Sequence, residues 1–206
     1  MLYVIDHPII KVKLSRMRNK NTDSKAFRSN LMELSQLMAY EVTKNYHNVS
    51  FPIETPMGPT KGYKMRENIV LVPILRAGLG MVDGFKSIIP QAPIGFIGLY
   101  RDEKNLKPIH YYCKMPESIK GANIIVLDPM LATGNSAAEA IKILKKYKPN
   151  SIRLAAIVSV KRGIQTVQKA CKDVDIYVAA IDEKLNRDGY IIPGLGDAGD
   201  RIFGTK

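Results

Sequence analysis

An acid and a loop of small and hydroxyl-bearing residues follow a short apolar run in the middle of the chain. The run spans residues 123–127, and after it come Asp128 and a loop that contains Thr133, Gly134 and Ser136. The residues after Ser136 favour a helix, and the free N–H groups and positive dipole end of a helix start suit a phosphate. The two hydroxyls can donate to that phosphate, and the Asp128 carboxylate can accept hydrogen bonds from sugar hydroxyls. This pattern predicts a site for a ribose 5-phosphate.

A second loop combines a permanent positive charge with small residues. Arg76 follows the apolar run 69–75 and is itself followed by Ala-Gly-Leu-Gly, so N–H groups and a guanidinium fork can face an anion. The alternative hypothesis is a dinucleotide-binding loop, because two of these glycines follow a predicted strand and open a helix. However, Gly84 stands one position too late for the third glycine of that pattern, and the next predicted strand ends at Arg101 instead of an acid. Anion binding is therefore the preferred interpretation.

Two more segments carry candidate chemistry. Arg101 opens a loop dense in charge, which is either a solvated hairpin or a mobile lid whose arginine reaches a bound diphosphate and whose closure excludes water. The lid is the favoured interpretation. Near the C-terminus, residues 190–200 contain four glycines or prolines among eleven residues. A structural tail rarely needs so many special turns, so this segment is predicted to form a binding site.

The composition is that of an ordinary globular protein with a strong positive charge. The 206 residues are 46% hydrophobic and 24% charged, and the formal net charge is +12, which fits a polyanionic partner such as a phosphorylated metabolite or a nucleic acid. No zinc-finger spacing or aromatic–basic RNA motif is present, which makes nucleic acid the less favoured partner. Neither a signal peptide nor a membrane-spanning run is expected. Cys113 and Cys171 are far apart, which favours free thiols in a reducing cytoplasm.

The surrounding pattern alternates strands with helices. This alternation predicts an α/β fold in which helices flank a central, mostly parallel sheet, in one domain over residues 1–206. Ligand loops then lie at the carboxyl ends of the strands. Pro73 conflicts with a central ladder position, so it is expected near a strand end or at a bulge. Strands are predicted at 2–5, 69–75, 94–100, 123–127, 151–160 and 175–181, helices near 27–46, 82–89, 137–144 and 163–172, and hairpins from 53–55 with 61–64 and from 94–100 with 109–112.

The three motifs, taken together, resemble a known family. Four hydrophobic residues, an acid and a loop ending in Ala-Thr-Gly resemble the phosphoribosyl diphosphate loop of the type I phosphoribosyltransferases. Most of that family has a second acid where this chain has Pro129, and this departure resembles the uracil phosphoribosyltransferase branch. Residues 72–81 and 189–200 are similar to that branch as well, and the similarity runs nearly end to end. The branch usually has glycine in place of Asn135; asparagine tolerates a left-handed backbone, so the loop is expected to survive.

The resemblance implies a fold, a reaction and a set of site residues. The implied fold adds a protruding β-hairpin and a C-terminal base-binding hood at about residues 181–206. The implied reaction transfers a 5-phosphoribosyl group from phosphoribosyl diphosphate to uracil, giving uridine monophosphate and diphosphate, with Mg²⁺ as cofactor. The residues implied as catalytic are Asp128, Arg76 and Arg101; those that bind phosphoribosyl diphosphate are Arg76, Arg101, Asp128, Pro129, Met130, Leu131, Ala132, Thr133, Gly134, Asn135, Ser136 and Asp197; those that bind uracil are Ile191, Gly196, Asp197 and Ala198; and those near the metal, indirectly, are Asp128 and Asp197.

Other properties follow from the resemblance or stay open. A homodimer or homotetramer is expected, with helix 27–46 either packed on the core or shared with another subunit, and GTP or CTP is a possible effector. A strained cis peptide is predicted between Arg76 and Ala77. The alternatives are a phosphoribosyltransferase for another base and an RNA-binding regulator on the same fold. Four other acids are expected to be caps, turns or surface acids, namely Asp6, Asp83, Asp182 and Asp200.

Overall fold

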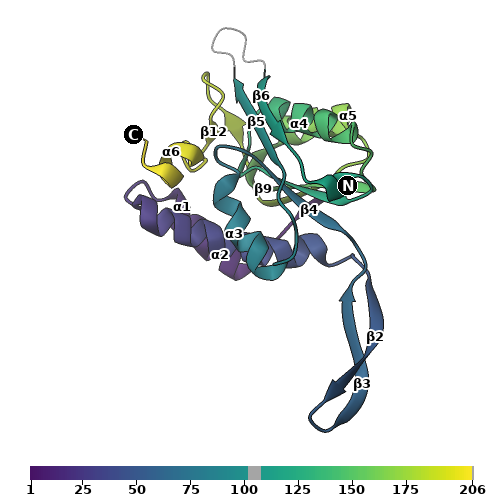
Figure 1. Cartoon of the computed structure of the whole chain (residues 1–206). Helices are drawn as coiled ribbons and strands as arrows, with labels where there is room; N and C mark the ends of the chain where they lie inside the picture. Colours follow the sequence, from purple (N-terminus) through teal and green to yellow (C-terminus); the bar gives the residue numbers. More distant parts are fainter. Residues whose placement is uncertain (102–107, 206) are drawn as a thin grey trace.

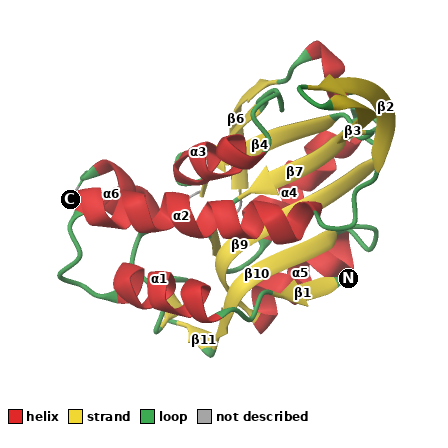
Figure 2. Ribbon diagram, turned by 90° about the horizontal axis from the view of Figure 1, so that it is seen from below, coloured by secondary structure: helices red, strands yellow, loops and turns green. Residues whose placement is uncertain are grey.

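The computed structural model, which describes residues 1–101 and 108–205, is built around one mostly parallel sheet (Figures 1 and 2). All of its strand pairs are parallel except β5 with β6, which form an antiparallel hairpin at one edge. In spatial order the strands are β1 (Leu2–Val4), β10 (Asp175–Asp182), β9 (Ser151–Val160), β7 (Asn123–Leu127), β4 (Ile69–Leu75), β5 (Phe96–Arg101) and β6 (Pro108–Lys114), and the short strand β8 (Met130–Leu131) pairs with β9.

Helices cover both faces of this sheet because its strands are apolar on both sides. Leu71 of β4 and Ile125 of β7 pack toward α1 (Pro8–Arg18), α2 (Ser24–Thr43) and α3 (Leu79–Ile88). Their neighbours Val70 and Ile124 face α4 (Asn135–Lys145) and α5 (Lys161–Ala170) on the opposite side. Figure 2 shows the two helical layers with the sheet between them. The fold class predicted from the sequence is confirmed.

Helix α1 was not predicted, although its signals are present in the sequence. Pro8 stands at its first turn, the His7 ring accepts a hydrogen bond from the Ile9 N–H at 3.2 Å, and Ile10 and Leu14 are buried at helical spacing. The basic side chains of the segment masked this periodicity. The next helix, α2, was predicted, although it begins and ends a few residues earlier than expected. Asp23 caps it by accepting from the Ala26 N–H at 2.7 Å, and its apolar residues are buried against the core.

The predicted β-hairpin is formed by β2 (Asn48–Thr55) and β3 (Gly58–Met65), and it projects from the body of the molecule (Figure 1). Its strands are longer and its turn is tighter than expected, since Thr55 already pairs with Gly58. The prediction for Pro73 also holds. It lies opposite Leu127 of β7, near the end of β4, in the gap between the Leu71–Ile94 bridge and the pairing of Ile74 with β5.

The remaining elements are short and lie at the ends of the sheet. They are the 3₁₀ helix η1 (Glu117–Ile119), the two-stranded pair of β11 (Lys184–Leu185) with β12 (Ile191–Ile192), and helix α6 (Ala198–Phe203). In the part of the chain that the structure describes, no helix has both the length and the apolar composition needed to cross a membrane.

Candidate active site

The loop that joins β7 to the first turn of α4, residues 128–136, forms a compact turn, which we call the phosphate turn. Asp128 is half-buried directly after β7, and its Oδ1 accepts a hydrogen bond from the Met130 N–H at 3.2 Å. Gly134 has φ +80° and stands immediately before the first residue of α4. Thr133 Oγ1 accepts from the Asn135 N–H at 3.5 Å. A cavity of about 40 Å³ lies inside this turn and is lined by Asp128, Met130, Leu131, Ala132, Thr133, Gly134, Ser136 and Ala137.

Close backbone contacts hold this loop against α5. A Cβ atom at Gly134 would lie 2.4 Å from the Gly163 carbonyl oxygen, and one at Gly163 would lie 2.4 Å from the Ala132 carbonyl oxygen. Both positions therefore require glycine. Asn135 begins α4, and the left-handed conformation that we considered for it belongs instead to Gly134; among the described non-glycine residues only Lys148 has a positive φ. The departure at Asn135 therefore leaves the turn intact.

The Arg76 loop lies beside this turn because of another glycine. A Cβ atom at Gly78 would lie 2.4 Å from the Leu127 carbonyl oxygen at the end of β7. A cis peptide is present, but it joins Leu75 to Arg76, so the predicted Arg76–Ala77 bond was wrong by one position. The Leu79 N–H already bonds to the Arg76 carbonyl. The change from strand to helical path therefore falls between the last residue of β4 and Arg76.

The C-terminal segment meets the Arg76 loop. Arg76 Nη2 lies 3.4 Å from Asp200 Oδ1, and the Asp200 N–H donates to Asp197 Oδ1 at 2.9 Å. The Asp200 side chain is 16% exposed and that of Arg76 is 57% exposed. The sequence analysis left Asp200 out of the site as a cap, turn or surface acid; the structure instead places it against the arginine of another motif. Its position three residues after Asp197, in the same glycine-rich segment, was the available signal.

A cavity of about 310 Å³ joins the C-terminal segment to the phosphate turn. Met130 and Ala132 line one side of it, and Gly196 and Ala198 belong to the other. Ile191 and Asp197 also line it. This cavity and the Arg76–Asp200 contact therefore bring together three predicted motifs that are far apart in sequence, two of which follow the neighbouring strands β7 and β4.

Arg101 is placed only in part. It is the last residue of β5, whose neighbour β4 leads into the Arg76 loop, so its backbone is at the carboxyl end of the sheet. The charged loop 102–107 lies outside the described residues. The contact of Arg101 with a diphosphate and the closing lid therefore stay predictions.

A half-buried arginine, Arg201, anchors the C-terminal segment to the start of the chain. Arg201 donates hydrogen bonds to the carbonyl oxygens of Leu195 at 2.9 Å and of Asn19 at 2.8 Å, and also to those of Met17 and Thr22. Its guanidinium lies 4.5 Å from the centre of the Phe27 ring. Burial lowers the pKa of Arg201 from its usual value. Because these partners belong to α1 and the turn after it, this anchor was missed together with that helix.

Metal binding at this site depends on substrate oxygens. Among the described residues, no group of three or more His, Cys, Asp and Glu side chains is arranged to hold a metal ion. Mg²⁺ commonly binds through one or two carboxylates together with phosphate oxygens. Asp128 and Asp197 each line a cavity at the convergence of the motifs. This set of residues fits Mg²⁺ that arrives with a phosphorylated substrate.

The fold is that of the type I phosphoribosyltransferases. A purine phosphoribosyltransferase from Pyrococcus horikoshii superposes with a TM-score of 0.52 at 15% identity, over 75% of this chain and 84% of that chain. A hypoxanthine phosphoribosyltransferase from Staphylococcus aureus gives a TM-score of 0.51 at 13% identity, over 76% and 75% of the two chains. At these identities the likeness concerns the fold alone.

The chain belongs to the uracil phosphoribosyltransferase family, whose model matches residues 4–205. A uracil phosphoribosyltransferase from Malacoplasma penetrans is 58% identical over 206 residues, covering 100% of both chains. Another, from Clostridium perfringens, is 58% identical over 203 residues and covers 98% of this chain and 97% of its own. The solved structure of the AQ2163 protein from Aquifex aeolicus has a TM-score of 0.96 at 36% identity, over 100% and 99% of the chains.

Proposed function

We propose that this protein transfers the 5-phosphoribosyl group of phosphoribosyl diphosphate to N1 of uracil and releases uridine monophosphate and diphosphate. The observation that carries the proposal is the cavity shared by Met130 and Ala132 of the phosphate turn with Gly196 and Ala198 of the C-terminal segment. A sugar phosphate bound in the turn would present its C1 toward a base held by the C-terminal segment. The family relationship supports the same substrates.

Each part of the site has a role in this reaction. The N–H groups after Gly134, with the hydroxyls of Thr133 and Ser136, bind the 5-phosphate, while Asp128 accepts from the ribose hydroxyls. The adjoining residues of the turn, Pro129 to Ala132 and Asn135, shape the same pocket. Arg76 and Arg101 stabilise the departing diphosphate. The sugar C1 passes through an oxocarbenium-like state, as in glycoside cleavage.

Positioning supplies most of the catalysis in this scheme. The base is held against C1 and the leaving group is held by arginines, so that reaction becomes effectively unimolecular. No histidine lies among the described residues that line the two cavities at the convergence of the motifs. In this scheme the departing diphosphate and backbone groups handle the proton of uracil N1, without an obligatory side-chain base.

Uracil is recognised by backbone groups. It carries two carbonyl acceptors and N–H donors, which backbone atoms of Ile191, Gly196 and Ala198 can pair, with Asp197 adjacent. Cytosine would oppose a donor with its amino group, and leaving buried polar groups unpaired discriminates strongly between substrates. In this scheme residues 181–206 form the base-binding hood. The hood and the rest of the chain make up one domain.

Mg²⁺ would be held by Asp128 and Asp197, directly or through water, together with the oxygens of the substrate. When bound, it neutralises charge on the diphosphate. We place the protein in the cytoplasm, where Cys113 and Cys171, both free in the structure, would stay reduced. We also propose a homodimer or homotetramer with GTP or CTP as a possible effector, which light scattering with and without each nucleotide tests.

A turnover assay with uracil, phosphoribosyl diphosphate and Mg²⁺, repeated with Asp128→Asn, tests the function. We expect release of uridine monophosphate by the native protein and a loss of about 100-fold or more in the variant, because the neutral amide binds the ribose hydroxyls and the metal poorly. A native rate at background refutes the function, and an undiminished variant removes Asp128 from the site. Cytosine, hypoxanthine and orotate serve as competing bases, and salt-sensitive RNA binding without turnover would favour a regulator.

A further inference from the structure

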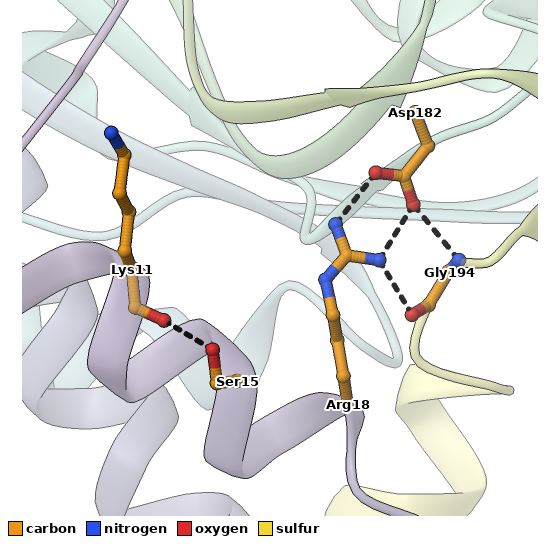
Figure 3. Close-up of polar contacts among 5 residues, drawn as sticks. All are labelled: Lys11, Ser15, Arg18, Asp182 and Gly194. Carbon is orange, nitrogen blue, oxygen red and sulfur yellow. Dashed lines mark hydrogen bonds and ion pairs between the residues drawn. The ribbon is translucent and has the colours of Figure 1, made fainter.

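An arginine, an aspartate and a glycine form a closed hydrogen-bonded group between α1, the end of β10 and the C-terminal segment (Figure 3). Arg18 Nη2 donates to Asp182 Oδ1 at 2.6 Å, and Arg18 Nη1 donates to Asp182 Oδ2 at 2.7 Å. Arg18 Nη1 also donates to the Gly194 carbonyl oxygen at 2.8 Å, and the Gly194 N–H donates to Asp182 Oδ2 at 2.8 Å. We call these three residues the Arg18 clamp. It holds both backbone polar groups of Gly194.

The clamp joins three parts of the fold. Arg18 is the last residue of α1, and Asp182 is the last residue of β10, at the carboxyl end of the sheet. The Asp182 side chain is 6% exposed and that of Arg18 is 25% exposed. The sequence analysis expected Asp182 to be a cap, turn or surface acid, and this was wrong because its partner lies in the unpredicted helix α1. A bidentate pair at such burial holds one geometry.

The geometry of Gly194 controls the residues on either side of it. Gly194 follows the cis peptide between Ile192 and Pro193 and has φ +59°. A Cβ atom on it would lie 2.1 Å from the Ile191 carbonyl oxygen, so the turn folds tightly back on Ile191. Ile191 on one side and Gly196 on the other both line the cavity beside the phosphate turn. A shift of Gly194 would therefore move both edges of the base pocket.

We propose that Arg18 and Asp182 are positioning residues for the nucleobase. They act through Gly194 by fixing the backbone of residues 191–198 in the orientation that pairs with uracil, an inference that rests on the proposed function. Stability alone is a weak reason for such a pair, since apolar residues of similar volume often replace a buried ion pair at no cost in stability. What an apolar pair cannot replace is the donor and the acceptor that hold Gly194.

The test variant replaces the ion pair with apolar residues, Arg18→Met combined with Asp182→Leu, and so removes the donor and the acceptor that hold Gly194. It removes the clamp without leaving a buried charge unpaired. We expect kcat/KM for uracil to fall by about 10- to 100-fold, mainly through a higher KM for uracil, because a displaced site loses its near-attack geometry. The KM for phosphoribosyl diphosphate should rise less than the KM for uracil, since the phosphate turn is untouched and Asp197 is the one residue of the displaced segment that is assigned to that substrate. The preference for uracil over cytosine falls as well.

Two further variants separate positioning from general fastening. Arg28→Met removes a different arginine bond to the same segment, from Arg28 Nη1 to the Ile202 carbonyl oxygen at 2.7 Å, and should leave the KM for uracil unchanged. Arg18→Lys keeps the charge and loses the planar fork. It should give a KM for uracil between those of the native protein and the double variant. The proposal is overturned if the double variant unfolds at the same denaturant concentration as the native protein and also has the same KM for uracil.

Hydrogen exchange tests the clamp without relying on the identity of the base. Amides of residues 191–198 should exchange faster in the double variant than in the native protein, while those of residues 128–136 keep their protection. Unchanged protection of 191–198 overturns the clamp, whatever the substrate. If the native protein converts another base but not uracil, the proposed function is refuted but the clamp is not. The effect of the double variant is then measured on the KM for that other base.

Discussion

The phosphate turn and the C-terminal segment serve one cavity but are held in place by different means. Residues 128–136 are fixed by backbone contacts, with Gly134 against Gly163 of α5 and Met130 paired with Val158 of β9. Residues 181–206 are fixed by long side chains from the other end of the chain. Arg18 and Asp182, for example, are separated by 164 positions. Close backbone packing places the first region, whereas the second adds long-range side-chain hydrogen bonds to a tight turn at Gly194.

This difference indicates how each region tolerates change. A Cβ atom added at Gly134 would lie only 2.4 Å from a backbone oxygen, which leaves no room for even one methyl group, so the phosphate turn should fail abruptly. A guanidinium network spreads its contribution over several hydrogen bonds, so the C-terminal segment should loosen by degrees. The four predictions below test this contrast, from the largest expected effect to the smallest.

Gly134→Val should remove activity almost completely. The new Cβ would meet the Gly163 carbonyl and would force φ away from +80°. We expect kcat/KM for phosphoribosyl diphosphate to fall by about 100-fold or more, with a loss of about 1–3 kcal/mol in the free energy of unfolding. Gly121→Val is the matched control, since Gly121 has φ +71° but no atom beyond its chain neighbours within 4 Å of its Cβ position. Equal losses of kcat/KM in the two variants would contradict the explanation by close contact with Gly163.

Arg76→Lys should separate the leaving-group role from the contact with the C-terminal segment. The lysine keeps a charge near Asp200 but loses the planar fork that matches a diphosphate. We expect the KM for phosphoribosyl diphosphate to rise by about 10-fold, and steady-state kinetics with each substrate varied in turn measures it. If only the KM for uracil rises, Arg76 acts on the base pocket and belongs to the other half of the comparison.

Arg201→Met should loosen the C-terminal segment without disturbing the phosphate turn. The carbonyl oxygens of Leu195, Asn19 and Thr22 would each lose a charged donor. We expect a loss of about 1–3 kcal/mol in the free energy of unfolding, measured by urea denaturation. Since the partners are backbone atoms, Arg201→Lys should recover part of that loss. A stability equal to that of the native protein would show that the network contributes no net stabilisation.

Asn135→Gly should have the smallest effect, although it restores the residue that is usual in the resembled branch. Asn135 is exposed and helical at the start of α4, and the left-handed conformation lies at Gly134. We expect turnover within about twofold of the native value and a change of about 0.5 kcal/mol or less in unfolding free energy. A large gain in activity would show that the Asn135 side chain obstructs the phosphate.

The sequence was sufficient for features that depend on neighbours in the chain. The apolar run before Asp128 predicted a buried strand, and the small residues that end at Ser136 predicted the turn and the helix after it. Both are present. The hairpin was predicted for the same reason. A basic, weakly apolar segment hid α1, and the residues that pair with it were missed as a consequence.

What the sequence by itself determined was the set of strands, turns and motifs, because apolar periodicity and turn preferences act over a few residues. Tertiary structure alone decided that Asp182 is a buried partner of Arg18 and that Asp200 lies against Arg76. Those contacts depend on which strands are neighbours and on where α1 crosses them. Residue spacing along the chain carries no such information, since a hydrogen bond between positions 18 and 182 exists only after the sheet has been assembled.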